Sequence, residues 1–109
     1  MTKRLPELNQ MYHFRFDGVQ YNIKYVADDT MECICTAADL NHHPSRINQL
    51  KIFKVSRFEI EPNIWCVYWA TPKVSMVHIE DWNEMKVIAI ITPPDMKQSR
   101  ENGIITKAE

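Results

Sequence analysis

The chain has 109 residues, and its 13 Lys and Arg residues nearly balance its 14 Asp and Glu residues. This length is that of one domain with one hydrophobic core. The near-zero net charge excludes the basic surface that holds nucleic acid or an anionic membrane. No segment approaches the roughly 18 consecutive apolar residues of a membrane span, and residues 1–10 lack the apolar core of a signal peptide. We therefore expect a soluble cytoplasmic protein without nucleic-acid or membrane partners.

The sequence begins with a polar segment, and after it apolar and polar residues alternate. We expect residues 1–10 to form an arm over one end of the domain, and residues 11–107 to form the folded domain. At the start of that domain Tyr12, Phe14 and Phe16 alternate with polar residues. Because successive side chains of a strand point to opposite faces, this pattern predicts a half-buried strand.

Turn signals divide the remaining chain into further strands. Asp17-Gly18 predicts a tight hairpin, because glycine adopts the positive φ that such a turn needs. Residues 64–71 are apolar on both faces, which is typical of a strand packed on both sides. The residues that we expect to form strands are 11–17, 20–25, 31–36, 51–60, 64–71, 74–80, 86–92 and 103–106.

About eight short strands joined mostly by tight turns predict an all-β fold, an antiparallel up-and-down barrel that closes on itself. The exception among the connections is segment 37–49, which contains His42, His43 and Arg46 and breaks the alternation. We expect this loop to cover one mouth of the barrel. Its side chains either contact a ligand there or form an exposed polar loop.

The three cysteines indicate a reducing compartment. Cys33 and Cys35 are two residues apart on one expected strand, which is too far for an easy disulfide. With Cys66 isolated in the sequence, they do not supply the four close ligands of a structural zinc site. We expect reduced, buried thiols, no metal and no cofactor.

A barrel of about eight strands either fills its interior with side chains or holds one small ligand. Strand alternation places a mainly aromatic set of residues on the face that we expect to be the interior. The set is Tyr12, Phe14, Phe16, Tyr21, Tyr25, Trp65, Val67 and Trp69. Two interpretations stay open: a filled aromatic core, and a pocket for a small apolar or aromatic molecule.

His78 and Glu80 are the leading candidates for catalysis. They are two residues apart on an expected strand and so share one face. If that face is inward, Glu80 could orient His78 as a general base. The opposite face, with Val77 and Ile79, is the more apolar one. We therefore expect His78 and Glu80 to face outward as a solvated pair, with the inward arrangement as the alternative.

Three short motifs in the second half of the chain occur in the same order as in a known family. They are Val67-Tyr68-Trp69, the run VHIEDWN at residues 77–83, and Pro94-Asp95. Together with the opening hairpin YHFRFDGVQYNIKY, they resemble the MoaF-like family of calycin proteins. The resemblance implies a lipocalin-like barrel over nearly the whole chain. Where that family tends to have glycine in its turns, this chain has Glu84-Met85 and Met96.

The same layout resembles phenolic acid decarboxylases, whose barrel holds its substrate without metal or cofactor. In that family two tyrosines and a glutamate transfer protons, and this chain has Phe14, Phe16 and Thr71 at the matching positions. The family's arginine corresponds to Arg46. The resemblance therefore implies the barrel, with Thr71 and Arg46 beside a ligand, and excludes decarboxylase activity.

Three hypotheses for function follow. The first is an uncharacterised MoaF-like barrel that binds a small apolar or aromatic molecule in its interior. The second is a cofactor-free lyase, isomerase or cyclase with His78 as general base and a tyrosine as acid. The third is a homodimeric protein-interaction module that pairs through a sheet face rich in Val and Ile. A fold of this kind does not by itself decide among them.

Overall fold

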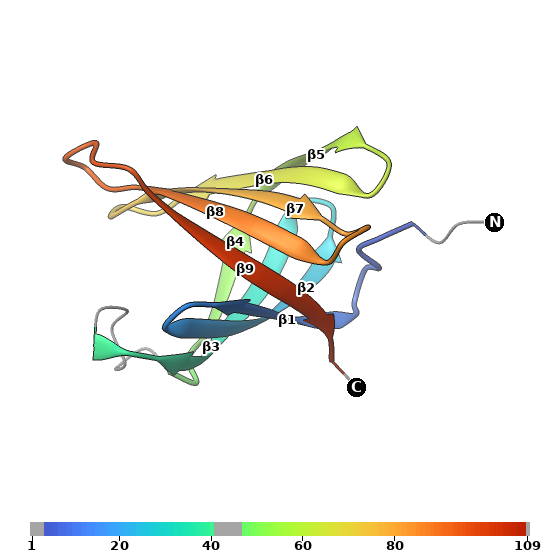
Figure 1. The fold of residues 1–109 in the computed structure, drawn as a ribbon, viewed down its shortest axis with the longest axis horizontal. Helices are drawn as coiled ribbons and strands as arrows, with labels where there is room; N and C mark the ends of the chain where they lie inside the picture. The colour runs from blue at the N-terminus through green and yellow to red at the C-terminus, as the bar shows by residue number, and fades with distance from the viewer. Residues whose placement is uncertain (1–3, 41–46, 109) are drawn as a thin grey trace.

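A computed structural model describes residues 4–40 and 47–108, which form one sheet curled into a nearly closed barrel (Figure 1). The strands are β1 (Met11–Phe16), β2 (Val19–Ala27), β3 (Thr30–Ala38), β4 (Leu50–Lys54), β5 (Ser56–Glu61), β6 (Ile64–Ala70), β7 (Ser75–Asp81), β8 (Lys86–Thr92) and β9 (Ser99–Lys107). Their order in the sheet is β4-β3-β2-β1-β9-β8-β7-β6-β5, with antiparallel neighbours. The predicted antiparallel up-and-down barrel is confirmed, with nine strands where about eight were expected.

Strand β9 joins the two halves of the sheet, because it pairs with β1 on one side and with β8 on the other. It is longer than the strand predicted over residues 103–106. Its first residues, Ser99-Arg100-Glu101-Asn102, are polar, so alternation of apolar residues does not mark them as a strand. Their backbone groups are paired with Ile88–Ile91 of β8, and this pairing extends the strand.

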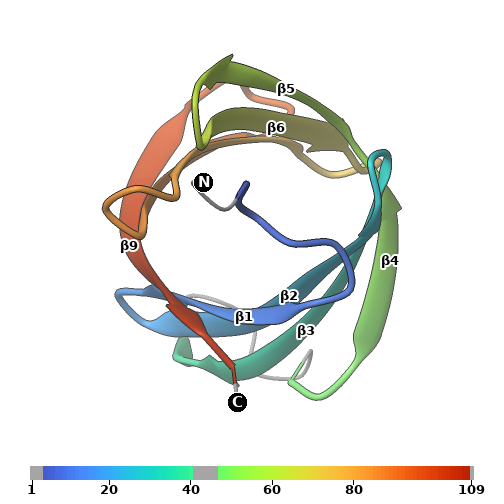
Figure 2. The same ribbon diagram turned by 90° about the vertical axis from the view of Figure 1, so that its right-hand side faces the viewer.

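The strand predicted over residues 51–60 is in fact two strands. Val55 between them is buried, and its backbone N–H donates a hydrogen bond to the carbonyl oxygen of Asp29 at 2.8 Å. The chain leaves its pairing with β3 at this point and begins to pair with β6. Strands β4 and β5 are therefore the two edges of the sheet. We call the place where they meet the seam (Figure 2).

The segment before β1 crosses one end of the barrel (Figure 2). Its backbone is held at both sides of the opening: the N–H of Leu5 donates to Oδ1 of Asn63 at 2.9 Å, and the N–H of Asn9 donates to the carbonyl oxygen of Tyr25 at 2.8 Å. The indole N–H of Trp65 donates to the carbonyl oxygen of Leu5 at 2.8 Å. The arm thus covers one barrel mouth with a hydrogen-bonded backbone.

Two turns use methionine in a conformation that usually favours glycine. Met85 has φ of 57° and Met96 has φ of 66°. These are the turns in which the sequence has methionine at the position expected for glycine, and both methionines adopt the left-handed conformation.

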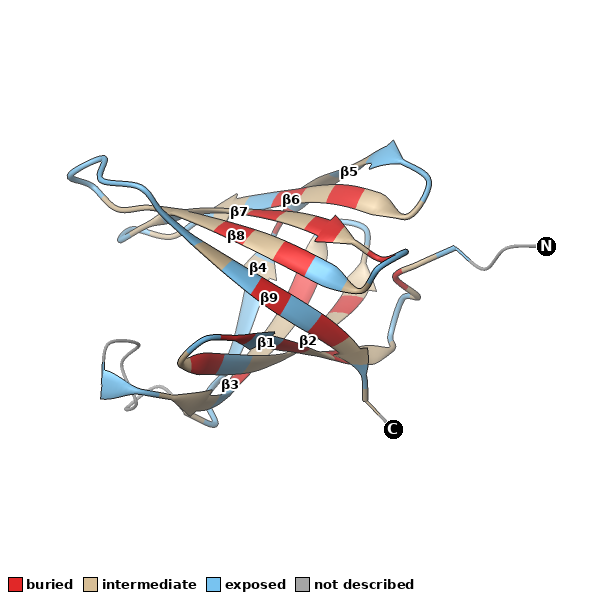
Figure 3. Ribbon diagram, in the orientation of Figure 1, coloured by how far each residue is buried: buried red, intermediate tan, exposed pale blue. Residues whose placement is uncertain are grey.

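Figure 3 shows exposed positions along the strands of the barrel, and several of them are apolar residues of the outer wall. Ile52 on β4 is 62% exposed, and Phe58 and Ile60 on β5 are 53% and 50% exposed. In this part of the molecule an apolar residue type therefore does not mark the inner face.

Gly103 on β9 lies where a side chain would collide with the core. An added Cβ atom would come within 2.7 Å of Cδ1 and Cε1 of Phe16 and within 3.0 Å of Cγ1 of Val87. We expect Gly103→Ala to lower the free energy of unfolding by about 1–3 kcal/mol, because an overpacked core must shift its side chains. Urea denaturation measures this, with the exposed neighbour Asn102→Ala as control, for which a change within about 0.5 kcal/mol is expected. Equal stability of the two variants would contradict the prediction.

Candidate functional site

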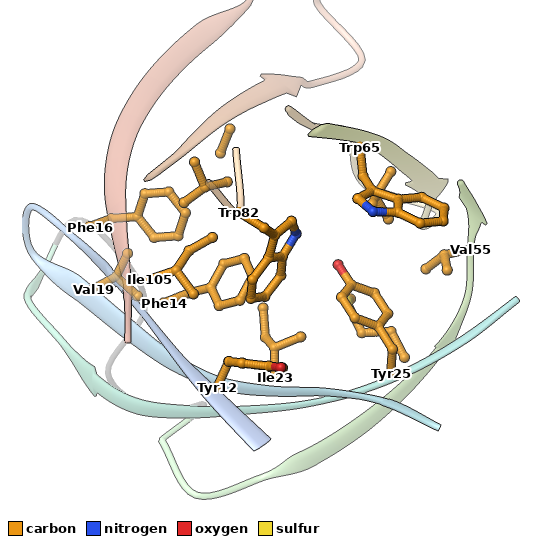
Figure 4. Close-up of a cluster of buried hydrophobic side chains, with 14 of the residues drawn as sticks. Tyr12, Phe14, Phe16, Val19, Ile23, Tyr25, Val55, Trp65, Trp82 and Ile105 are labelled. Carbon is orange, nitrogen blue, oxygen red and sulfur yellow. The ribbon is translucent and has the colours of Figure 1, made fainter. Parts of the chain in front are cut away.

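The barrel interior is filled mainly by aromatic side chains (Figure 4). Six residues of the set expected inside are buried there: Tyr12, Phe14, Phe16, Tyr25, Trp65 and Val67. Trp69 is half-buried and packs against this core. Of the two interpretations left open by the sequence, the filled aromatic core describes most of the interior.

Tyr21 lies at the margin of the core and Thr71 lies outside it. Tyr21 is on the same face of β2 as the buried Val19, Ile23 and Tyr25, and it is half-buried, with its ring packed edge-on against Phe16. Strand β6 ends before Thr71, whose Oγ1 accepts hydrogen bonds from the N–H groups of Lys73 and Val74 at 3.2 and 3.1 Å. Thr71 therefore stabilises the turn between β6 and β7. Arg46, like His42 and His43, lies outside the described residues.

Strand β7 has the opposite orientation to the one expected. His78 and Glu80 point into the barrel, where they are 4% and 0% exposed. Val77 and Ile79 face the outer wall, which is itself partly apolar, so their residue type does not mark the inner face. Glu80 can lie inside the core because Tyr25 and Trp82 donate hydrogen bonds to it there.

Glu80 is the centre of a buried polar cluster. The hydroxyl of Tyr25 donates a hydrogen bond to Oε2 of Glu80 at 2.6 Å, and the indole N–H of Trp82 donates to Oε1 at 3.1 Å. Nδ1 of His78 lies 3.3 Å from the same Oε2. A buried carboxyl group is costly unless it is hydrogen-bonded, and here both of its oxygens have donors. Glu80 thus holds three side chains from two separate parts of the sequence in fixed positions.

Tyr25 remains a hydrogen-bond donor in this cluster. Burial raises the pKa of Tyr25 well above its ordinary value, and the negative charge of Glu80 and the hydrogen bond to it raise the pKa further. The positive charge of Arg57 opposes these effects but does not cancel them. The hydroxyl proton of Tyr25 lies in the hydrogen bond to Glu80, so Tyr25 does not donate it to a ligand.

Arg57 is a member of the interior that the sequence did not indicate. Its side chain is only 4% exposed, and its guanidinium group lies over the rings of Tyr25 and Trp65, at 4.8 and 4.6 Å from their centroids. Nε and Nη2 donate to the backbone and side-chain oxygens of Asp28 across the seam, at 3.0 and 3.1 Å. Among the described residues, Nη1 of Arg57 is the buried side-chain nitrogen that has no hydrogen-bond partner.

The ring of His78 is enclosed by aromatic side chains. It stacks on Phe14 with the ring centroids 5.9 Å apart, and the edge of Trp69 approaches it with a centroid distance of 4.9 Å. Phe53 of β4 also packs against Trp69, at 5.8 Å between centroids. Trp69 therefore contacts both His78 and a residue of the edge strand β4.

A surface depression of about 460 Å³ lies at the seam. Three segments line it, one at the junction of β4 and β5 and two at the adjacent ends of β6 and β7: Lys54, Val55, Ser56, Tyr68, Trp69, Ala70, Ser75, Met76 and Val77. Its volume falls within the range of about 300–1,000 Å³ that is typical of small-molecule sites. Trp69 forms part of its lining and also contacts the ring of His78, so one side chain touches both the depression and the buried histidine.

A second depression, of about 270 Å³, lies away from the seam and is more polar. Its lining comes from β1, β2, β3 and β9: His13, Arg15, Gln20, Tyr21, Asn22, Thr36 and Thr106. Nδ1 of His13 is hydrogen-bonded to Oδ1 of Asn22, so this histidine is engaged by its neighbour. The polar depression around His13 can therefore serve as a control site for experiments on the seam.

The three cysteines form no disulfide. Burial raises the pKa of the Cys33 thiol to about 12, with a smaller contribution from Cys35. Burial also raises the pKa of the Cys35 and Cys66 thiols. None of them therefore has the lowered pKa of a reactive thiolate. Within the described ranges, no three His, Cys, Asp or Glu side chains are grouped closely enough to hold a metal ion.

No described residue belongs to a helix with the length and hydrophobicity that crossing a membrane would require.

The nearly closed antiparallel barrel with an aromatic core defines a small calycin-like barrel protein. Residues 8–106 match the profile of the MoaF-like family, so the chain belongs to this family. No curated protein matches the sequence. A crystal structure from Burkholderia vietnamiensis, named a "putative beta-lactamase", is similar in fold, with a TM-score of 0.79 and 16% sequence identity. The similarity covers 98% of this chain and 100% of that chain, and at this identity it shows the fold alone.

Proposed function

We propose that the protein binds a small apolar or aromatic molecule at the seam, with the ligand packed against Trp69 and Met76. The observation that carries this proposal is the position of the depression. It lies where the ring of paired strands is open, and an aromatic side chain of the core forms part of its lining. Concave sites lined by aromatic and apolar residues are the usual form of small-molecule sites.

The seam also offers a route toward the interior. Arg57 and Asp28 connect its two sides at the turn between β2 and β3. The N–H of Val55, which lines the depression, donates to the carbonyl oxygen of Asp29 in the same turn, so the depression lies next to this connection. There, Phe53 and Trp69 are partly buried side chains at the margin of the core. A ligand that takes the place of their contact would reach the ring of His78. In this proposal the ligand enters from the side of a filled barrel, and does not occupy a pocket in the middle of the interior.

The charge and the thiols of the chain support the rest of the proposal. A net charge of −1 offers no attraction to nucleic acid or to anionic membranes, which we therefore do not expect as partners. Free cysteines with raised pKa values suit the reducing conditions of the cytoplasm, where we place the protein.

Two-dimensional NMR tests the proposal with phenylacetone and indole as probes. We expect saturable shifts of the Trp69 indole N–H signal and of the backbone amides at residues 54–56 and 75–77. Ligands with about ten heavy atoms commonly gain roughly 3–4 kcal/mol, so a Kd near 1 mM is expected. Shifts confined to the polar depression around His13, or no saturable shift at all, would contradict the proposal.

Matched variants make the test independent of signal assignment. Ala70→Trp places an indole in the depression from an exposed position and should abolish binding. Thr36→Trp makes the same kind of change in the polar depression, also from an exposed position, and should leave the Kd unchanged. Equal loss of binding in both variants would point to a general effect of the added ring.

A further inference from the structure

We propose that His78 is a general base that takes a proton from a carbon next to a carbonyl group of a bound aryl ketone, while Nη1 of Arg57 donates a hydrogen bond to the carbonyl oxygen. The inference rests on the proposed function, since the substrate must enter at the seam. It adds a reaction and a substrate class to that site.

Glu80 determines which nitrogen of His78 can act as a base. Oε2 of Glu80 faces Nδ1 at 3.3 Å, so the proton of a neutral imidazole is best placed on Nδ1. Nε2 then carries the lone pair. Within the described ranges, no side chain forms a hydrogen bond with Nε2, and Phe14 and Trp69 enclose the ring. Glu80 is thus a positioning residue, in the manner of a carboxylate that orients a catalytic histidine.

Arg57 lies on the same inner row of the wall as His78. In the strand register Arg57 is opposite Val67, and Val67 is opposite His78. Neighbouring strands are about 4.8 Å apart, so the two Cα atoms are separated by roughly 10 Å, with the side chain of Val67 between them. Among residues 4–40 and 47–108, no group forms a hydrogen bond with the buried Nη1 atom of Arg57. An unsatisfied buried donor is costly, and a carbonyl oxygen at this position would satisfy it.

The pair can support proton transfer without any other reactant. Nε2 of His78 takes the proton from the α-carbon, and the electrons of that C–H bond form a carbon–carbon double bond. The π electrons of the carbonyl group move to its oxygen, where Nη1 of Arg57 stabilises the negative charge. The imidazolium then returns the proton to the carbon or to the oxygen. The products are the original ketone or its enol, so atoms and electrons balance.

The aromatic surroundings select the substrate class. The depression is lined by Trp69 and Met76, and His78 is stacked on Phe14. An uncharged ketone with an aryl group fits such surroundings, because its ring packs on apolar surfaces and its one polar group meets Arg57. A strongly hydrated substrate would lose its hydration there without compensating partners.

Hydrogen–deuterium exchange of phenylacetone in D₂O tests the proposal. The wild-type protein should accelerate exchange of the benzylic protons, seen by proton NMR, by at least about 100-fold over buffer, which is within the usual contribution of general-base catalysis. His78→Gln should return the rate to that of buffer, while the Kd for phenylacetone, measured by the shift of the Trp69 signal, changes by less than about twofold. His13→Gln, which removes the histidine of the polar depression, should exchange at the wild-type rate.

Two further variants separate the roles of the neighbours. Arg57→Met should lower the maximal exchange rate by at least about tenfold, because it removes the donor to the developing oxyanion. Glu80→Gln should lower the maximal rate and leave the half-saturating concentration unchanged, as expected for a positioning residue. If His78→Gln does not fold, ¹⁵N NMR of the wild-type imidazole replaces it: saturating phenylacetone should shift the Nε2 signal of His78.

The outcomes distinguish the two proposals. Saturable binding at Trp69 without accelerated exchange would overturn the catalytic role and leave the binding site intact. Exchange that persists in His78→Gln, or a His78 Nε2 signal that does not respond to saturating ketone, would also overturn it. Absence of binding to the wild-type protein would overturn both proposals together.

Discussion

Trp82→Ala is expected to lower the free energy of unfolding by about 3–5 kcal/mol, the usual cost of deleting a buried large aromatic side chain. Trp82 is 1% exposed, and its ring packs edge-on against Tyr12 and Phe14, with centroid distances of 4.6 and 5.9 Å. Its indole N–H also donates to Glu80. A loss of this size is a large part of the roughly 5–15 kcal/mol that stabilises a domain.

Urea denaturation measures the effect, and two further variants serve as an intermediate case and as a control. Trp82→Phe keeps an aromatic ring but removes the donor to Glu80, so its cost should lie between those of the wild type and Trp82→Ala. Phe58→Ala removes an aromatic ring from the outer wall, where it is 53% exposed, and should change the free energy by about 0.5 kcal/mol at most. A cost below about 1 kcal/mol for Trp82→Ala would show that Trp82 is not a central member of the core.

Tyr25→Phe is expected to lower the free energy of unfolding by about 1.5–3 kcal/mol, because it removes a hydrogen bond to the buried carboxyl group of Glu80. The fall in Tm should be about 6–12 °C for a domain of this size. The ring itself is retained, so its contacts with Arg57 persist. The matched control is Tyr68→Phe, since Tyr68 is 47% exposed and should contribute little through its hydroxyl.

The difference in the free energy of unfolding between the wild type and Tyr25→Phe should decrease at high pH. In the unfolded chain tyrosine ionises near pH 10, whereas burial and Glu80 raise the pKa of Tyr25 in the folded protein. Above pH 10 the unfolded state therefore binds fewer protons than the folded state, and stability falls as pH rises. The difference between the two proteins should be constant below about pH 9 and shrink above pH 10 by up to ~1.4 kcal/mol per pH unit. A constant difference up to pH 11 would contradict the raised pKa.

Most strands of this barrel could be predicted because their signal is local. Alternation at Tyr12, Phe14 and Phe16 marks β1, and the hairpin at Asp17-Gly18 marks its end. Strand β9 was underestimated because its first half is polar, and only its pairing with β8 makes it a strand. The break at Val55 was missed because residues on both sides are extended, and a change of pairing partner leaves no mark in an alternating sequence.

The candidate site could also be predicted only in part from the sequence. His78 and Glu80 could be selected from their spacing on one strand, but their inward orientation could not. Their neighbours Val77 and Ile79 are apolar and yet lie on the outer wall. Nothing in the sequence indicated that Arg57 is buried, since a charged residue on an edge strand is usually exposed. Its burial depends on the rings of Tyr25 and Trp65, which the fold brings beneath it.

The sequence by itself determined the type of fold, the family and the aromatic character of the core, because these depend on residue types and on a period of two along each strand. Only the tertiary structure decided which face of β7 is inside, where the barrel wall is open, and which groups surround Glu80. The physical reason is that a buried charge is tolerated only when donors reach it. Here those donors come from Tyr25, 55 positions away in the chain, and from Trp82 beyond the end of the same strand.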